Sequence, residues 1–217
     1  MKMKLKILVF IFGLCALNIK AQGLKVVYNL FEIQNDKYIE VEGLYFELII
    51  KDGKSLFTSH KPMDIDSNTR YGTIIRRFAS GNYYVDVSEC INLVQAEIFE
   101  TIYLIEEEFN TNWVIESKFK EILGYNCQMA TRNSIVDKIG KTVTKEVWFA
   151  KDINFNFGPY DTYNLPGLIL AHYVKGHNFI TMATKISTYN DEVELPEGMR
   201  ISLENLEEKM QEYMRNN

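Results

Sequence analysis

The stretch Leu44–Ser59, LYFELIIKDGKSLFTS, contains two apolar runs on either side of one turn signal. In the first run every second residue is large and apolar, as in a strand with one buried face: Leu44, Phe46, Leu48 and Ile50. Asp52-Gly53 follows, and both residue types tolerate the positive φ that a tight hairpin turn requires. The stretch therefore predicts a β-hairpin and, with it, antiparallel sheet.

The same period of two recurs along most of the chain. Further candidate strands are Leu24–Leu30, Tyr71–Phe78, Tyr83–Val87, Ala96–Ile105, Trp113–Phe119, Tyr125–Arg132, Val143–Ala150, Leu168–Tyr173 and Phe179–Ser187. Short turns join these runs without helical crossovers, which favours antiparallel neighbours. We expect a mainly β fold, in which a single antiparallel meander sheet curves into a half-barrel or open barrel.

The C-terminus follows a helical pattern instead. Ser202 can cap a helix, and acidic residues follow it in the first turns, where the helix dipole favours negative charge. Four apolar residues fall on one helical stripe: Leu203, Leu206, Met210 and Met214. We therefore expect a C-terminal α-helix that packs on the sheet through this stripe.

The N-terminus has the order of a secretory signal. Three lysines at positions 2, 4 and 6 precede the apolar run Ile7–Leu17, and the small residue Ala21 follows. The run is shorter than the roughly 20 residues that span a bilayer. We expect residues 1–21 to be a cleaved signal peptide and residues 22–217 to form one β-rich domain. The domain would then be periplasmic or secreted and would not span the membrane.

Charge and cysteine content narrow the partners and the covalent chemistry. The net charge of −5 falls to about −9 without the lysine-rich signal segment, which argues against a nucleic-acid partner. Cys90 and Cys127 would remain, in a compartment where a disulfide persists. The sequence does not decide whether they pair, because nothing in it brings their Cα atoms within bonding range.

The segment Gly158–Tyr173, GPYDTYNLPGLILAHY, combines turn residues with a strand. Pro166 presets φ near −65° and Gly167 can take positive φ, as positions i+1 and i+2 of a type II turn require. Leu168 and Ile169 then begin an apolar run without alternation, which is typical of a strand buried on both faces. The interpretation as a structural corner is favoured over a direct ligand contact.

Residues around this segment resemble a known family. They are Trp113, the stretch Ile122–Cys127, Ala130, Trp148-Phe149, Ile153, Gly158-Pro159-Tyr160 and Leu165-Pro166-Gly167-Leu168-Ile169. In this order and spacing the chain resembles the GLPGLI family, exported proteins of Gram-negative bacteria without an assigned activity. Two positions depart from the family pattern. Asn164 replaces the first glycine of the motif, and Asn154 replaces a proline.

The first departure preserves the backbone requirement, because asparagine tolerates the left-handed conformation better than other non-glycine residues. The motif residues Asn164, Leu165, Pro166, Gly167, Leu168 and Ile169 are therefore expected to be structural. Aromatic residues near the turn could instead border a cavity. The candidate binding residues are Trp148, Phe149, Tyr160, Tyr163 and Pro166.

Catalytic and metal-binding patterns are incomplete in the sequence. His172 and His177 lack a third metal ligand nearby, and no serine lies in a Gly-x-Ser-x-Gly motif. We therefore expect no catalytic residue, metal or cofactor. The favoured hypothesis is a noncatalytic envelope protein that binds a hydrophobic ligand or partner segment. The alternatives are an interaction protein without a pocket and, less favoured, a hydrolase that uses His172 or His177.

Overall fold

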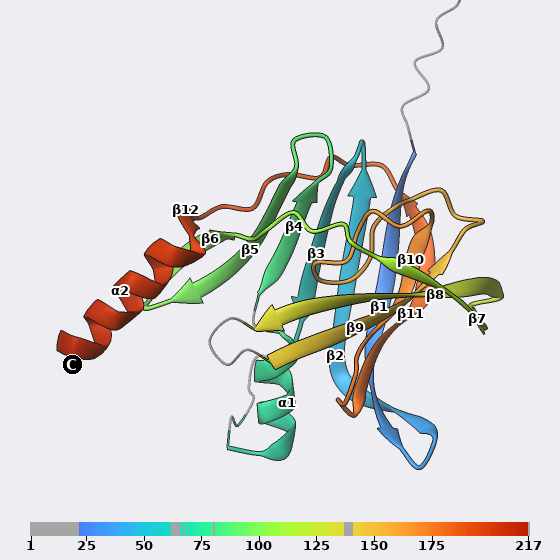
Figure 1. The fold of residues 1–217 in the computed structure, drawn as a ribbon, viewed down its shortest axis with the longest axis horizontal. Coiled ribbons are helices and arrows are strands. Elements are labelled where there is room, and N and C mark those ends of the chain that lie inside the picture. Colours follow the sequence, from blue (N-terminus) through green and yellow to red (C-terminus); the bar gives the residue numbers. More distant parts are fainter. Residues whose placement is uncertain (1–21, 62–65, 67, 80, 137–140, 217) are drawn as a thin grey trace, which may run out of the picture.

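The fold is that of a computed structural model, which describes residues 22–61, 66, 68–79, 81–136 and 141–216. The predicted signal peptide lies outside these residues. Within them the chain is mainly β, with one sheet of twelve strands that is not closed into a barrel (Figure 1). The predicted fold class is therefore confirmed.

The elements follow one another along the chain with two helices among the strands. The strands are β1 (Gly23–Gln34), β2 (Lys37–Lys51), β3 (Lys54–His60), β4 (Asn82–Asp86), β5 (Ile91–Ile98), β6 (Thr101–Glu106), β7 (Val114–Ile122), β8 (Tyr125–Val136), β9 (Lys141–Ala150), β10 (Leu168–Val174), β11 (Phe179–Tyr189) and β12 (Met199–Ser202). The helices are α1 (Arg70–Phe78) and α2 (Leu203–Asn216).

The sheet consists of two meanders that meet at β1 and β11. Its order is β12-β6-β5-β4-β3-β2-β1-β11-β10-β9-β8-β7. Neighbouring strands are antiparallel except for the parallel pair of β12 and β6. In the hairpin of β2 and β3, Asp52 and Gly53 have φ values of 50° and 76°, as the turn signal predicted.

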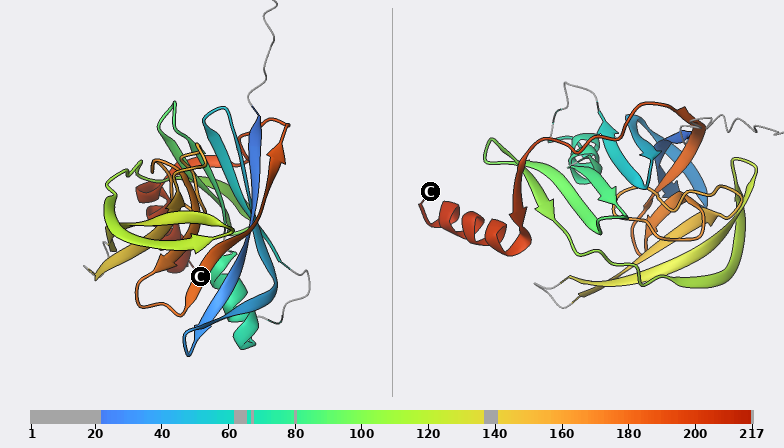
Figure 2. Two further views of the ribbon diagram at one scale, coloured as in Figure 1. Left: turned by 90° about the vertical axis from the view of Figure 1, so that its right-hand side faces the viewer. Right: turned by 90° about the horizontal axis from the view of Figure 1, so that it is seen from above.

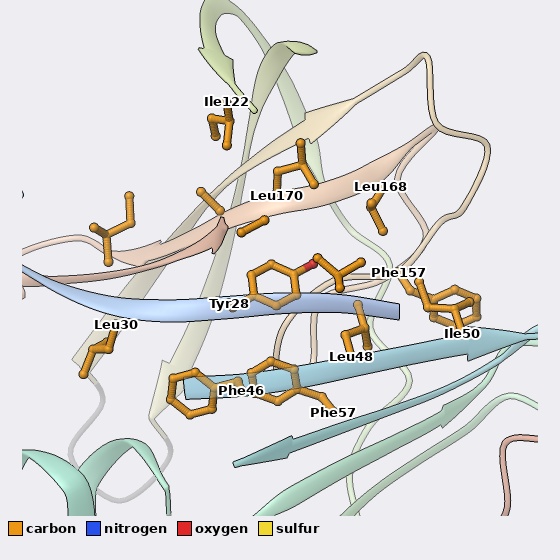
Figure 3. Close-up of a cluster of buried hydrophobic side chains, with 14 of the residues drawn as sticks. Tyr28, Leu30, Phe46, Leu48, Ile50, Phe57, Ile122, Phe157, Leu168 and Leu170 are labelled. Carbon is orange, nitrogen blue, oxygen red and sulfur yellow. The ribbon is translucent and has the colours of Figure 1, made fainter. Parts of the chain in front are cut away.

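The sheet curls (Figure 2), and the apolar side chains on its inner face form one buried cluster. Side chains of β1, β2 and β3, among them Tyr28, Phe46 and Phe57, pack toward Leu168 and Leu170 of β10 (Figure 3). All five are at most 1% exposed. The concave side is therefore filled by the protein's own side chains. Burial of these apolar side chains provides most of the driving force for folding.

The structure corrects two of the predicted strands. Tyr71–Phe78 lies in helix α1, because the apolar residues of this segment recur at helical spacing and Thr69 caps its N-terminus. The Thr69 hydroxyl accepts a hydrogen bond of 2.9 Å from the Gly72 amide. The predicted strand Ala96–Ile105 is divided between β5 and β6, because Phe99 and Glu100 both take positive φ and form a tight turn.

The C-terminal helix packs on the sheet edge through its first turns. The Ser202 hydroxyl accepts a hydrogen bond of 3.2 Å from the Asn205 amide, as a capping residue does. Leu206 is buried against Tyr103, Ile105 and Ile201. The other three residues of the predicted stripe are exposed: Leu203, Met210 and Met214. No helix in the described part of the chain has the length and apolar character needed to cross a bilayer.

Candidate functional site

The motif turn joins the interior loop of residues 151–167 to β10. Gly167 has a φ of 150° and Asn164 a φ of 64°, so both take the positive φ that was predicted for them. The turn itself differs from the predicted type II turn. The Gly167 amide donates to the Leu165 carbonyl at 2.8 Å, while the Leu168 amide donates to the Ile153 carbonyl at 3.1 Å. In a type II turn the Leu168 amide would donate to the Leu165 carbonyl, but here it donates to the loop residue Ile153 instead.

Close backbone packing explains why position 167 is a glycine. A Cβ atom there would lie 2.2 Å from the Ala150 carbonyl oxygen, far inside van der Waals contact. Leu168, Ile169 and Leu170 are each 0% exposed, as expected for a strand buried on both faces. The motif therefore forms a tightly packed corner between the interior loop and the sheet.

The five candidate binding residues differ in how far they are buried. Phe149 and Tyr163 are completely buried, and Tyr160 packs its ring 4.8 Å from Phe57. Trp148 is half-buried under the Lys120 ammonium group, which lies 4.4 Å from the centre of its ring. Pro166 is exposed. Trp148, Tyr160 and Tyr163 belong to the main hydrophobic cluster, whereas Phe149 belongs to a second one.

The interior loop carries a charge that the sequence prediction missed. The Asp161 carboxylate lies 2.5 Å from both the Arg132 Nη2 and the Lys145 Nζ atoms. Arg132 on β8 is 3% exposed and also donates to the Asn110 carbonyl at 2.8 Å. Its guanidinium lies 4.6 Å from the centre of the Trp113 ring. These contacts join β8, β9 and the interior loop. We call Arg132, Lys145 and Asp161 the ionic cluster.

The cluster fixes the protonation states around it. Burial opposes ionisation of Asp161, but Lys145 and Arg132 outweigh it and hold the pKa of this carboxyl below its usual range. Burial, with help from Lys145, lowers the pKa of His172 to about 3. The His172 ring lies 5.0 Å from the Tyr160 ring, and its Nε2 atom has no hydrogen-bond partner in the described chain. Neither group is suited to proton transfer near neutral pH.

No signal in one sequence pairs these charged residues. The ion pairs join residues that are 29 and 16 positions apart, so they depend on how the sheet brings the loop beside β8 and β9. The position of Asp161 between Tyr160 and Tyr163 is the one available hint, because it places a charge within a loop of aromatic residues. His177 lies between β10 and β11, with its Nε2 atom 2.9 Å from the Arg77 Nη2 atom.

The two cysteines of the described chain are free thiols. Cys90 is exposed in the turn after β4, whereas Cys127 is buried within β8. The disulfide that the sequence left open is therefore not formed in this structure.

An open groove lies between the hairpin of β1 and β2 and helix α1. It has a volume of about 510 Å³. Val41, Tyr71 and Ile74 form its apolar wall, and the polar residues around it are Glu32, Glu40, Glu42 and Arg70. The Tyr71 hydroxyl donates to the Glu42 carbonyl, which ties α1 to the hairpin. We call this space the α1 groove.

Together these features define a β-rich fold with one curled, largely antiparallel sheet and an interior loop. The fold is similar to solved structures of PNGF-II in the P21 and C2 space groups, with TM-scores of 0.61 and 0.59. Both similarities are at 16% sequence identity and cover 88% of this chain and 33% of PNGF-II. They establish the fold alone, and the chain spans about a third of the length of PNGF-II. No family model and no curated protein sequence matches the chain.

Proposed function

We propose that the chain is an exported, noncatalytic GLPGLI-like domain that binds an apolar partner segment in its α1 groove. The observation that carries this proposal is the groove itself, with its apolar wall of Val41, Tyr71 and Ile74. The order of charged and apolar residues at the N-terminus supports export. The spacing of the motif residues supports the family resemblance.

The packing of the sheet favours a groove at its end over a ligand on its concave face. Tyr28, Phe46 and Phe57 fill the space between the curled halves of the sheet (Figure 3). The α1 groove, in contrast, combines apolar side chains with an opening to solvent. Its volume falls within the range of about 300–1,000 Å³ that is usual for ligand sites.

The charges at the rim define the chemistry of the partner. Glu32 is paired with Arg70, whereas the neighbouring Glu40 and Glu42 are exposed and add negative charge. An apolar side chain flanked by a basic residue would complement both the wall and the rim. The occupant that fits the α1 groove is therefore an extended peptide segment of alternating apolar and basic residues.

The ionic cluster supports a noncatalytic function. His172 stays neutral above a pKa of about 3, and Asp161 stays ionised between two cations. A general acid or base works best when its pKa lies near the working pH.

Binding of a dye-labelled peptide of alternating leucine and lysine to residues 22–217 tests the proposal. Two matched peptides replace leucine with serine or lysine with glutamate. We expect fluorescence anisotropy to report binding of the leucine–lysine peptide and at least about tenfold weaker binding of the other two, a difference of about 1.4 kcal/mol. Equal binding of all three, or of none, would disprove the assignment.

Three variants locate the binding. Ile74→Asn removes part of the apolar wall, and Glu42→Lys reverses a rim charge without changing a buried side chain. Each should weaken binding about tenfold. Ile102→Asn, at an exposed apolar residue on β6, is the matched control and should bind as the unmodified protein does. If Ile74→Asn does not fold, Glu42→Lys still decides the question.

A further inference from the structure

A second hollow lies over the ionic cluster. It has a volume of about 470 Å³ and lies between the segment that follows β6 and the strands β8 and β9. Arg132, Lys145 and Asp161 line it on the side of the strands and loop, and Glu107 and Glu108 line it from the segment after β6. We call this space the polar cavity. It shares no lining residue with the α1 groove.

The strand side of the polar cavity is positive. Arg132 and Lys145 share the single carboxylate of Asp161, so one positive charge remains after this pairing. The Arg132 side chain is only 3% exposed, and its Nε atom has no hydrogen-bond partner in the described chain. Lys145 is 21% exposed, so its ammonium group can reach a ligand while it contacts Asp161. An ammonium group can donate three hydrogen bonds.

The opposite side is negative. Glu107 and Glu108 are both exposed, and they follow β6 as part of one acidic run. Partial desolvation and the nearby Asp161 raise the pKa of Glu107, while Lys145 and Arg132 oppose this rise. Glu107 is therefore electrostatically coupled to all three members of the ionic cluster, and the two sides of the cavity carry opposite charges within mutual reach.

We propose that the polar cavity binds a small zwitterion of the amino-acid type. Its carboxylate group meets the Lys145 ammonium beside Arg132, and its own ammonium group meets Glu107 and Glu108. A ligand with both charges satisfies both sides, whereas a ligand with one charge leaves the opposite side without a partner. The volume is sufficient for a small molecule of this class.

Titration calorimetry with three small molecules tests this proposal. The probes are 4-aminobutyrate, butyrate and butylamine, which share a carbon chain and differ in charged ends. We expect 4-aminobutyrate to bind residues 22–217 at least about tenfold more tightly than either single-charge probe. Equal binding of butylamine would show a simple cation site, and equal binding of butyrate a simple anion site. Either result, or no binding of 4-aminobutyrate, would overturn the proposal.

Substitutions in the acidic run separate the cavity from general charge effects. The double variant Glu107→Gln and Glu108→Gln removes the negative side and leaves the ionic cluster intact. It should weaken binding of 4-aminobutyrate about tenfold, to the level of butyrate. Glu106→Gln is the matched control, because Glu106 is exposed in the same run but does not line this cavity. An equal loss in this control would contradict the assigned location.

Discussion

The Tyr28 hydroxyl donates a hydrogen bond of 2.7 Å to the backbone carbonyl of Ile169, which lies 141 positions later in the chain. Both residues are 0% exposed. The pairing of β10 with β9 shifts register between Ile169 and Ala171, next to this carbonyl. The bond therefore joins β1 to the beginning of β10, where the strand pairing is irregular.

Replacement of Tyr28 tests how much this bond contributes. Tyr28→Phe keeps the ring but leaves the buried Ile169 carbonyl without this donor. We expect the free energy of unfolding in urea to fall by about 1–3 kcal/mol. Tyr38→Phe, at a side chain that is 52% exposed, should change it by less than about 0.5 kcal/mol. Equal effects of the two variants would contradict this role.

Gly167 should not tolerate a side chain. Gly167→Ala places a Cβ atom 2.2 Å from the Ala150 carbonyl oxygen at a backbone φ of 150°. We expect a loss of at least about 4 kcal/mol, or no folded protein, by circular dichroism and urea unfolding. Gly124→Ala is the control, since φ is also positive there but no atom of the described residues lies within 4 Å of an added Cβ atom. It should cost only about 1 kcal/mol, which reflects backbone strain alone.

Asn164 should be replaceable by glycine. Its φ of 64° lies in the left-handed region, and its side chain is exposed. Asn164→Gly should change the melting temperature little, whereas Asn164→Val should lower the stability by about 1–3 kcal/mol, because a β-branched residue is strained there. Similar melting curves for the valine and glycine variants would show that this conformation is not required.

The stability of the domain should depend on His172 as the pH falls. The pKa of His172 is about 3 in the folded protein and 6.5 in its ordinary state, so the unfolded chain binds the proton first. Stability should therefore decline as the pH falls from about 6.5 toward 3. Urea unfolding between about pH 4.5 and pH 7.5 covers this decline, and most carboxyl groups titrate below that range.

A glutamine substitution identifies the group that titrates. His172→Gln should flatten the pH profile between these limits, although it can lower the stability throughout. Asn164→Gly, which changes no titratable group, is the control and should keep the slope of the unmodified protein. An unchanged slope in His172→Gln would assign the dependence to another group.

The two thiols should react at different rates. Cys90 is exposed, while burial raises the pKa of the Cys127 thiol to about 11 despite the nearby Lys120. With residues 22–217 at neutral pH, a thiol reagent should label one cysteine quickly and the second only after unfolding. Cys90→Ser should abolish the fast reaction. Rapid labelling of both thiols would show that β8 opens readily.

Helix α1 shows where sequence interpretation failed for a local reason. The segment from Tyr71 to Phe78 contains β-branched and aromatic residues, which favour a strand by composition. Its apolar residues nevertheless recur at intervals of three and four, and Thr69 offers a capping hydroxyl. The helical signal was thus present, and spacing and capping predicted the structure better than composition did.

The sequence by itself determined the features that depend on neighbouring residues. The strand alternation, the turn at Asp52-Gly53, the positive φ of Asn164 and Gly167, and the Ser202 cap all follow from local backbone preferences. Local rules also predicted the mainly β class, because side chains alternate between the two faces of a strand.

The tertiary structure alone decided which distant residues meet. Curling of the sheet fills the concave face with Tyr28 and Phe46 and packs Tyr160 and Tyr163 into the same hydrophobic cluster. The same curling brings Asp161 between Arg132 and Lys145 and opposes them to Glu107 across the polar cavity. These contacts depend on the order of the strands and on the curvature of the sheet. The alternation of side chains along a strand is the same whichever strands are its neighbours, so the sequence pattern does not determine these contacts.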